Sequence, residues 1–153
     1  MSRHIIKRTI ERADSRLVDA LGEAGTATVH EAIGRVGYVG PHLRPIQRDV
    51  RIAGSAVTVL SHPGDNIMIH AAVEMCEEGD ILVVTNTAPS THGMFGDLLA
   101  ASLMARGVRG LVLDAGVREL ITSFWEMEAQ AEQIETFAET VWPLLEERAR
   151  ARA

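Results

Sequence analysis

Three side chains of this 153-residue chain, Asp97, Arg118 and Glu119, have the types and spacing of a site for an anion and a metal ion. Asp97 follows Gly96 at the start of a predicted helix, where free backbone N–H groups and the helix dipole favour a bound carboxylate or phosphate. Two carboxylates beside an arginine suit Mg²⁺ or Mn²⁺ together with an anionic substrate, because these cations prefer oxygen ligands and arginine grips a carboxylate through two hydrogen bonds. On spacing alone two other interpretations stay open: Asp97 could only cap its helix, and Arg118 and Glu119 could form a surface charge pair.

The elements that must position these side chains are predicted to alternate between strand and helix. The apolar runs predict strands and the segments between them predict helices, in the order 50–60, 66–79, 80–86, 96–107 and 108–116. This alternation predicts an α/β fold with a mainly parallel or mixed central sheet and flanking helices. Ligands of such sheets bind at the carboxyl ends of the strands, so Asp97, Arg118 and Glu119 are expected to converge there.

The remaining segments before residue 118 predict helices and loops. Apolar residues at helical spacing predict one helix over 3–24, and "TATVHEAIGR" predicts a second, capped by Thr26 or Thr28. We expect Asp65 to cap the helix that begins at residue 66. Gly54, inside a strand, indicates a bulge or a close approach of another segment. Polar residues with glycine and proline predict loops over "GYVGPHLRPI" and over 87–95.

The last 35 residues differ from the rest. Residues 1–118 carry 12 basic and 13 acidic groups, whereas residues 119–153 carry 3 basic and 8 acidic groups. Apolar residues there alternate spacings of four and three: Leu120, Phe124, Met127, Ala131, Ile134, Ala138, Val141 and Leu145. This pattern predicts a long amphipathic helix. We therefore divide the chain into an α/β domain over 1–118 and an acidic helical extension over 119–153 that packs on the domain or on a neighbouring subunit.

Composition excludes several classes of function. With 15 basic and 21 acidic residues the net charge is −6, which argues against nucleic-acid binding. No apolar run reaches the roughly 18–20 residues of a membrane span, and the charged N-terminus is unlike a secretory signal, so we expect a cytoplasmic protein. A single cysteine, Cys76, excludes an internal disulfide. Lys7 is the only lysine, so chemistry that needs a buried lysine amine has only this one candidate, near the chain terminus.

Asp97, followed after twenty residues by Arg118 and then Glu119, resembles the Asp-x20-Arg-Asp signature of the RraA-like family. The segments that resemble the aldolase branch of that family follow in order: "IERAD", "TVHEAIGR", "RPI", "IAGSAVTV", "PGDN", "GDILVV" and "FGDLLAASLMARGVRGLVLDAGVR". The resemblance covers about residues 8–118. It implies an RraA-like fold and a class II pyruvate aldolase acting on 4-hydroxy-4-methyl-2-oxoglutarate or 4-carboxy-4-hydroxy-2-oxoadipate, with oxaloacetate decarboxylation as a second activity.

The resemblance also implies a role for each matched residue. Glu119 stands where the family's metal-binding acid stands, with Mg²⁺ or Mn²⁺ as the cofactor. Arg118 would hold the carboxylate of the 2-oxo acid and stabilise the enolate, and Asp97 would orient metal-bound water. The backbone of Gly96, Asp97, Leu98 and Leu99 would cradle the pyruvyl group, and Asn66 would line the same pocket. The family also implies a homotrimer or homohexamer with its sites between subunits.

The chain departs from the family pattern at two positions and over its last part. Glu119 replaces the aspartate of the signature, and Thr122 stands where aldolases usually carry another acid. The sequence resemblance is expected to end at 118–119, where the acidic segment begins as a native, rearranged or frameshifted continuation. These departures leave an alternative open: a non-catalytic protein resembling the regulator of ribonuclease E, or an inactive family member. In that case the acidic surface could bind a basic protein segment.

Overall fold

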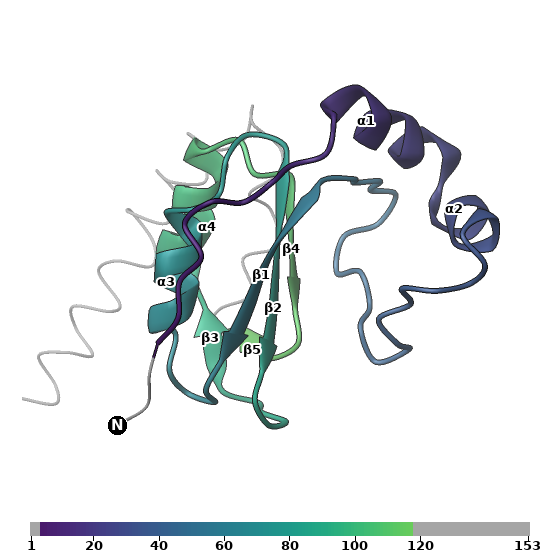
Figure 1. The fold of residues 1–153 in the computed structure, drawn as a ribbon. Helices are drawn as coiled ribbons and strands as arrows, with labels where there is room; N and C mark the ends of the chain where they lie inside the picture. The colour runs from purple at the N-terminus through teal and green to yellow at the C-terminus, as the bar shows by residue number, and fades with distance from the viewer. Residues whose placement is uncertain (1–3, 118–153) are drawn as a thin grey trace, which may run out of the picture. The chain divides into compact units, whose positions relative to one another are not determined.

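The computed structural model describes residues 4–117, which belong to one compact unit of the chain. Figure 1 shows its helices and strands. The helical extension predicted over 119–153 lies outside the described residues, as do Arg118, Glu119 and Thr122. Within residues 4–117, no helix is long and apolar enough to cross a membrane.

The central sheet has three parallel strands, as the sequence predicts. They are β1 (Ser55–Ser61), β2 (Asp80–Asn86) and β4 (Gly110–Leu113), in the order β1-β2-β4. The predicted strand over 80–86 is confirmed at both ends, whereas the strand predicted over 50–60 begins only at Ser55. A side chain at Gly54 would meet the carbonyl oxygen of Gly79 at 2.5 Å, so the predicted close approach is confirmed.

Two further strands form a separate parallel pair. β3 (Gly93–Phe95) pairs with β5 (Gly116–Val117), with Gly93 opposite Gly116 and Phe95 opposite Val117. The prediction that 87–95 is entirely loop is therefore wrong at its end. A side chain at Gly116 would lie 2.5 Å from the carbonyl oxygen of Thr91, so the pairing depends on a glycine that allows close backbone approach. Strands of two and three residues are too short to produce a recognisable alternation in the sequence.

Helices α3 (Ile67–Val73) and α4 (Asp97–Ala105) lie on one side of the three-stranded sheet (Figure 1). Both helices are predicted from the sequence, although α3 ends six residues earlier than its apolar pattern indicates. In β1, Val57, Val59 and Ser61 are buried while the alternating residues are exposed, with Leu60 61% exposed. The core therefore lies between the helices and this one face of the sheet.

The N-terminal helix is shorter than predicted. Helix α1 spans Ser15–Ala24, and residues 4–14 are not helical. The helix begins where the carboxylate of Asp14 accepts a hydrogen bond from the N–H of Arg16 at 2.9 Å. Helix α2 (Thr26–Ala32) is confirmed, but its N-cap is Gly25, which provides no side-chain hydrogen bond, so the predicted threonine cap is wrong.

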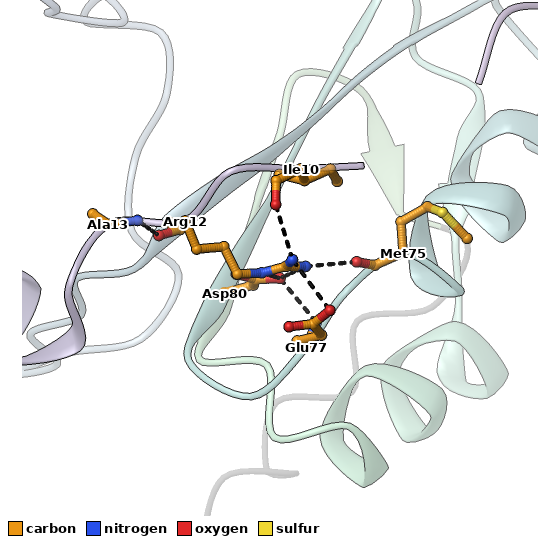
Figure 2. A network of polar contacts seen from close by, with 7 residues as sticks. Ile10, Arg12, Ala13, Met75, Glu77 and Asp80 are labelled. Carbon is orange, nitrogen blue, oxygen red and sulfur yellow. Dashed lines mark hydrogen bonds and ion pairs between the residues drawn. The ribbon is translucent and has the colours of Figure 1, made fainter. Parts of the chain in front are cut away.

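Residues 4–14 are not helical because tertiary contacts at Arg12 and Ala13 hold this segment to the sheet. The Arg12 guanidinium donates to both carboxylate oxygens of Asp80 at 2.8–3.1 Å and to the carbonyl of Met75 at 2.7 Å (Figure 2). Asp80 is only 1% exposed and also accepts from the N–H of Glu77 at 2.8 Å. Ala13 donates its N–H to the hydroxyl of Ser55 at 3.1 Å. A buried charge paired in this way outweighs the local helical tendency of a few exposed residues.

Candidate functional site

The carboxyl ends of β3 and β5 lie side by side, and each strand is followed in the sequence by residues of the predicted site. Because the strands are parallel and Phe95 lies opposite Val117, the chain leaves both strands on the same side. It continues into Gly96 and Asp97 after β3 and into Arg118 after β5. Both segments therefore follow strands of the small second sheet rather than of the central sheet, and the convergence of Asp97, Arg118 and Glu119 stays a prediction. The side chains of Arg118 and Glu119 lie outside the described residues, so their contacts stay predictions.

The start of α4 presents a mixed polar and apolar surface. Gly96 is the N-cap and makes no side-chain hydrogen bond, and its carbonyl accepts from the N–H of Ala100 at 3.0 Å. The N–H groups of the first helical turn have no intrahelical partner and can bind an anion. Asp97 is exposed and Leu98 is 77% exposed, whereas Leu99 is buried in the core. Leu99 can therefore contribute only its backbone to a ligand, while Asp97 and Leu98 can contribute side chains.

Asn66 lies in a loop that contacts the strand leading to Asp97. The N–H of Gly64 donates to the sulfur of Met94 in β3 at 3.2 Å. Asp65 accepts from the N–H of Ile67 at 2.9 Å, so it binds the first turn of α3 as predicted, but the helix begins one residue later and its N-cap is Asn66. Asn66 is the half-buried N-cap of α3, and its side chain makes no capping hydrogen bond. Its amide is therefore not committed to the helix, although a pocket shared with Asp97 stays a prediction.

A polar cluster at the carboxyl edge of the central sheet was not predicted from the sequence. Asp114 directly follows β4, and Thr85 and Asn86 end β2 beside it. The Thr85 hydroxyl donates to the Asp114 carboxylate and the Asn86 amide donates to the Asp114 carbonyl, each at 3.4 Å. The His42 imidazole lies 3.7 Å from the same carboxylate. The signal that could have found Asp114 is its position as the first polar residue after the apolar run "GLVL".

Two polar atoms at this edge are buried without a hydrogen-bond partner among the described residues. They are the hydroxyl oxygen of Ser61 and the amide oxygen of Asn86. Ser61 and Asn86 are register partners at the ends of β1 and β2. Buried polar atoms of this kind usually bind water or another polar group.

The described residues do not form a metal site by themselves. No three histidine, cysteine, aspartate or glutamate side chains within residues 4–117 are grouped so that they could hold a metal ion. Exposed Asp97 has the right chemistry for a contact through water, but further ligands would have to come from outside the described segment, as predicted for Glu119.

A groove of about 620 Å³ lies elsewhere, between the N-terminal segment and the elements β1 and α3. Its walls are mainly apolar and include Ile5, Ile10, Val57, Met68 and Met75. None of the site residues that the structure describes lines it. This groove is therefore separate from the surface around Asp97.

Cys76 is buried in the core, and desolvation, assisted by the negative charge of Asp80, raises the pKa of its thiol to about 11. At pH 8 only about one molecule in a thousand would then carry the reactive thiolate. We expect Ellman's reagent to label Cys76 at least about 100-fold more slowly in the native chain than in urea. Equal rates in the two conditions would contradict the burial of this thiol.

Comparison with known proteins gives two matches. The family model "RraA-like: Aldolase/RraA" matches residues 17–148, past residue 118, where the sequence resemblance was expected to end. A curated protein of Halalkalibacterium halodurans, "Putative 4-hydroxy-4-methyl-2-oxoglutarate aldolase", is 24% identical over 98 residues. The aligned part covers 64% of this chain and 47% of that relative, so the chain matches about half of the relative's length.

Proposed function

The chain belongs to the RraA-like family, and on this basis we propose that it is a divalent-metal-dependent aldolase that releases pyruvate. The proposed substrates are 4-hydroxy-4-methyl-2-oxoglutarate and 4-carboxy-4-hydroxy-2-oxoadipate. The first of them appears in the name of the curated relative. Oxaloacetate decarboxylation is proposed as a second activity, because it forms the same enolate of pyruvate.

The observation that carries this proposal is the register of β3 and β5. It pairs Phe95 with Val117, so the residues after each strand start from neighbouring positions on the same side. Consecutive Cα atoms are about 3.8 Å apart, so Val117 limits where Arg118 begins. This arrangement supports a site shared by the start of α4 and the Arg118–Glu119 pair.

Each proposed residue has a distinct task. Arg118 would bind the substrate carboxylate through two parallel hydrogen bonds, and the N–H groups at Gly96–Leu99 would orient the pyruvyl group. Asp97 would orient a water molecule at the reacting centre, and the Asn66 amide would bind a polar group of the substrate. Mg²⁺ or Mn²⁺, held by Glu119 and through water by Asp97, would supply Lewis-acid polarisation of the 2-oxo group when bound.

The reaction breaks the bond between C3 and C4 of the substrate. A base removes the proton of the 4-hydroxyl group, C4 becomes a carbonyl carbon, and the electron pair of the broken bond forms an enolate on C3. Protonation of C3 then gives pyruvate. The positive charge of Arg118 beside the developing enolate would lower the barrier, because it stabilises negative charge where that charge forms.

The test follows pyruvate release from both aldol substrates and from oxaloacetate, with Mg²⁺ or Mn²⁺ added and with a chelator as the blank. We expect metal-dependent release that falls at least about tenfold in Asp97→Asn. Glu74→Gln is the matched control, because it removes an exposed carboxylate that pairs with Arg106 at 2.7 Å. Release no faster than in the chelator blank would refute the catalytic proposal and leave the protein-binding alternative, whereas equal release in Asp97→Asn would remove Asp97 from the site.

A further inference from the structure

Strand β1 is an edge of the central sheet within residues 4–117, because it pairs with β2 on one side only. The carbonyl of Ser61 accepts from the N–H of Thr87 at 2.9 Å, so the main chain of Ser61 faces β2. Main-chain groups alternate between the two edges along a strand, so those of Ala56, Thr58 and Leu60 face the open edge. An edge with unpaired N–H and C=O groups is a template on which another extended chain can form hydrogen bonds.

The groove of about 620 Å³ lies between this edge and the N-terminal segment 4–11. The segment runs opposite to β1 (Figure 1) and reaches the start of the strand where Ala13 donates its N–H to the hydroxyl of Ser55. Within residues 4–117, no backbone hydrogen bond joins segment 4–13 to β1. The N-terminal segment therefore forms the opposite wall of the groove without pairing with the main-chain groups of the edge.

Helix α3 supplies an apolar side of the same groove. Met68, Ala71 and Met75 line it, and their spacing of three and four residues places them on one face of α3 and of the turn that follows it. All three are only half-buried, and methionine adapts to apolar side chains of different shapes. A groove between an open strand edge and such a helix face can bind an extended peptide, because the edge provides main-chain hydrogen bonds and the helix contacts alternate side chains.

Two exposed side chains of opposite charge line the groove, Lys7 and Glu11. Glu11 lies next to the residues that contact the start of β1, and Lys7 lies four residues earlier, toward the end of the strand, with His4 beyond it. Neither Lys7 nor Glu11 forms an ion pair with another residue of segment 4–117. A peptide that pairs antiparallel with β1, the slightly more stable arrangement, would pass Lys7 first and Glu11 about four residues later.

We propose that the open edge of β1 binds an extended segment of another protein, in which apolar and polar residues alternate and an acidic residue precedes a basic one by about four positions. The acidic residue would lie near Lys7 and the basic one near Glu11, while the apolar side chains would pack on Met68, Ala71 and Met75. This interaction goes beyond the proposed aldolase function, since none of the site residues that the structure describes lines the groove.

The test uses the peptide Ser-Glu-Val-Thr-Val-Lys-Ser, labelled with fluorescein at its N-terminus and amidated at its C-terminus. Fluorescence anisotropy measures its binding to the full chain, and we expect saturable binding. Two N-methylated versions, one methylated at both valines and one at threonine and lysine, remove alternate main-chain donors. The version methylated at the amides that face β1 should bind at least about tenfold more weakly, and the other should stay within about threefold. No saturable binding, or equal affinity of the two methylated peptides, would overturn the proposal.

Substitutions in the protein test the edge and the charges separately. Thr58→Pro removes one outward-facing N–H at a position where an edge strand tolerates proline, so binding should weaken at least about fivefold, whereas Thr58→Ser keeps the N–H and the affinity. Glu11→Lys should bind the probe about threefold more weakly and should regain the affinity with Ser-Glu-Val-Thr-Val-Glu-Ser. Glu23→Lys is the matched control, because Glu23 is an exposed carboxylate of α1 outside the groove. Weaker binding of both peptides to Glu11→Lys would overturn the proposal.

A second copy of this chain is the other occupant that the edge of β1 could pair with. Analytical ultracentrifugation of the full chain with and without the probe peptide distinguishes the two. An unchanged sedimentation coefficient, together with saturable binding, supports a segment of another protein. A smaller coefficient on addition of the peptide would overturn that assignment, because the peptide would then be displacing a second copy.

Discussion

Replacing Arg12 with alanine should lower the free energy of unfolding by about 3 kcal/mol. The substitution removes the charge partner of the Asp80 carboxylate, which is 1% exposed, and leaves it the N–H of Glu77 as the one hydrogen-bond donor to its side chain among residues 4–117. It also frees the extended segment 4–13, which Arg12 ties to the carbonyl of Met75. Urea unfolding followed by circular dichroism at 222 nm measures the change.

Arg16→Ala is the matched control for Arg12→Ala. Arg16 is a neighbouring arginine that also pairs with an aspartate, Asp14, at 3.0 Å, but its side chain is 89% exposed. Exposed pairs contribute about 0–1 kcal/mol, so this variant should unfold near the urea concentration of the unchanged chain. Equal losses in Arg12→Ala and Arg16→Ala would contradict the assignment of Asp80 as a buried charge that depends on Arg12.

Replacing Arg118 with alanine should reduce kcat/KM for pyruvate release by about 100-fold or more, if the proposed function is correct. The alanine side chain cannot bind the substrate carboxylate and supplies no positive charge beside the enolate. Arg118→Lys should recover only part of the activity, because lysine keeps the charge but lacks the planar fork that binds a carboxylate through two hydrogen bonds. A coupled assay that reduces the released pyruvate measures both variants.

Arg106→Ala controls for the loss of one arginine near α4. Arg106 is the C-cap of α4, at the end opposite Asp97, and it pairs with Glu74 at 2.7 Å. The kcat/KM of the Arg106→Ala variant for pyruvate release should stay within about twofold of that of the unchanged chain. A loss in Arg118→Ala no greater than that in Arg106→Ala would remove Arg118 from the proposed site.

Local patterns along the chain predicted most of the central sheet. The run "DILVVTN" predicted β2 at its observed bounds, because a buried parallel strand is apolar on both faces and ends at turn residues. The hydrogen bond of Asp65 to Ile67 was also predictable, because it joins residues two positions apart. Gly54 indicated a bulge or a close approach, but the sequence did not identify Gly79 as the partner. The family match confirms the resemblance that ordered motifs carry up to residue 118, but it extends to residue 148, so the expected end of the resemblance at 118–119 was wrong.

Contacts between distant residues were not predictable in this way. The helix predicted over 3–24 is confirmed in α1, but residues 4–13 are not helical. Their course is set by the contact of Arg12 with Asp80, a residue 68 positions later in the chain. The pairing of β3 with β5 depends on close backbone contact at Gly116. Segments of two or three residues are too short to show a periodic pattern in the sequence.

By itself, the sequence determined the alternation of strand and helix and the family, since these follow from local burial patterns and ordered motifs. Only the tertiary structure decided that β3 pairs with β5 in a second sheet, and that Arg12 pairs with the buried carboxylate of Asp80. The physical reason is that apolar periodicity specifies which face of an element is buried. It does not specify which distant segment supplies the hydrogen bonds at that element's end.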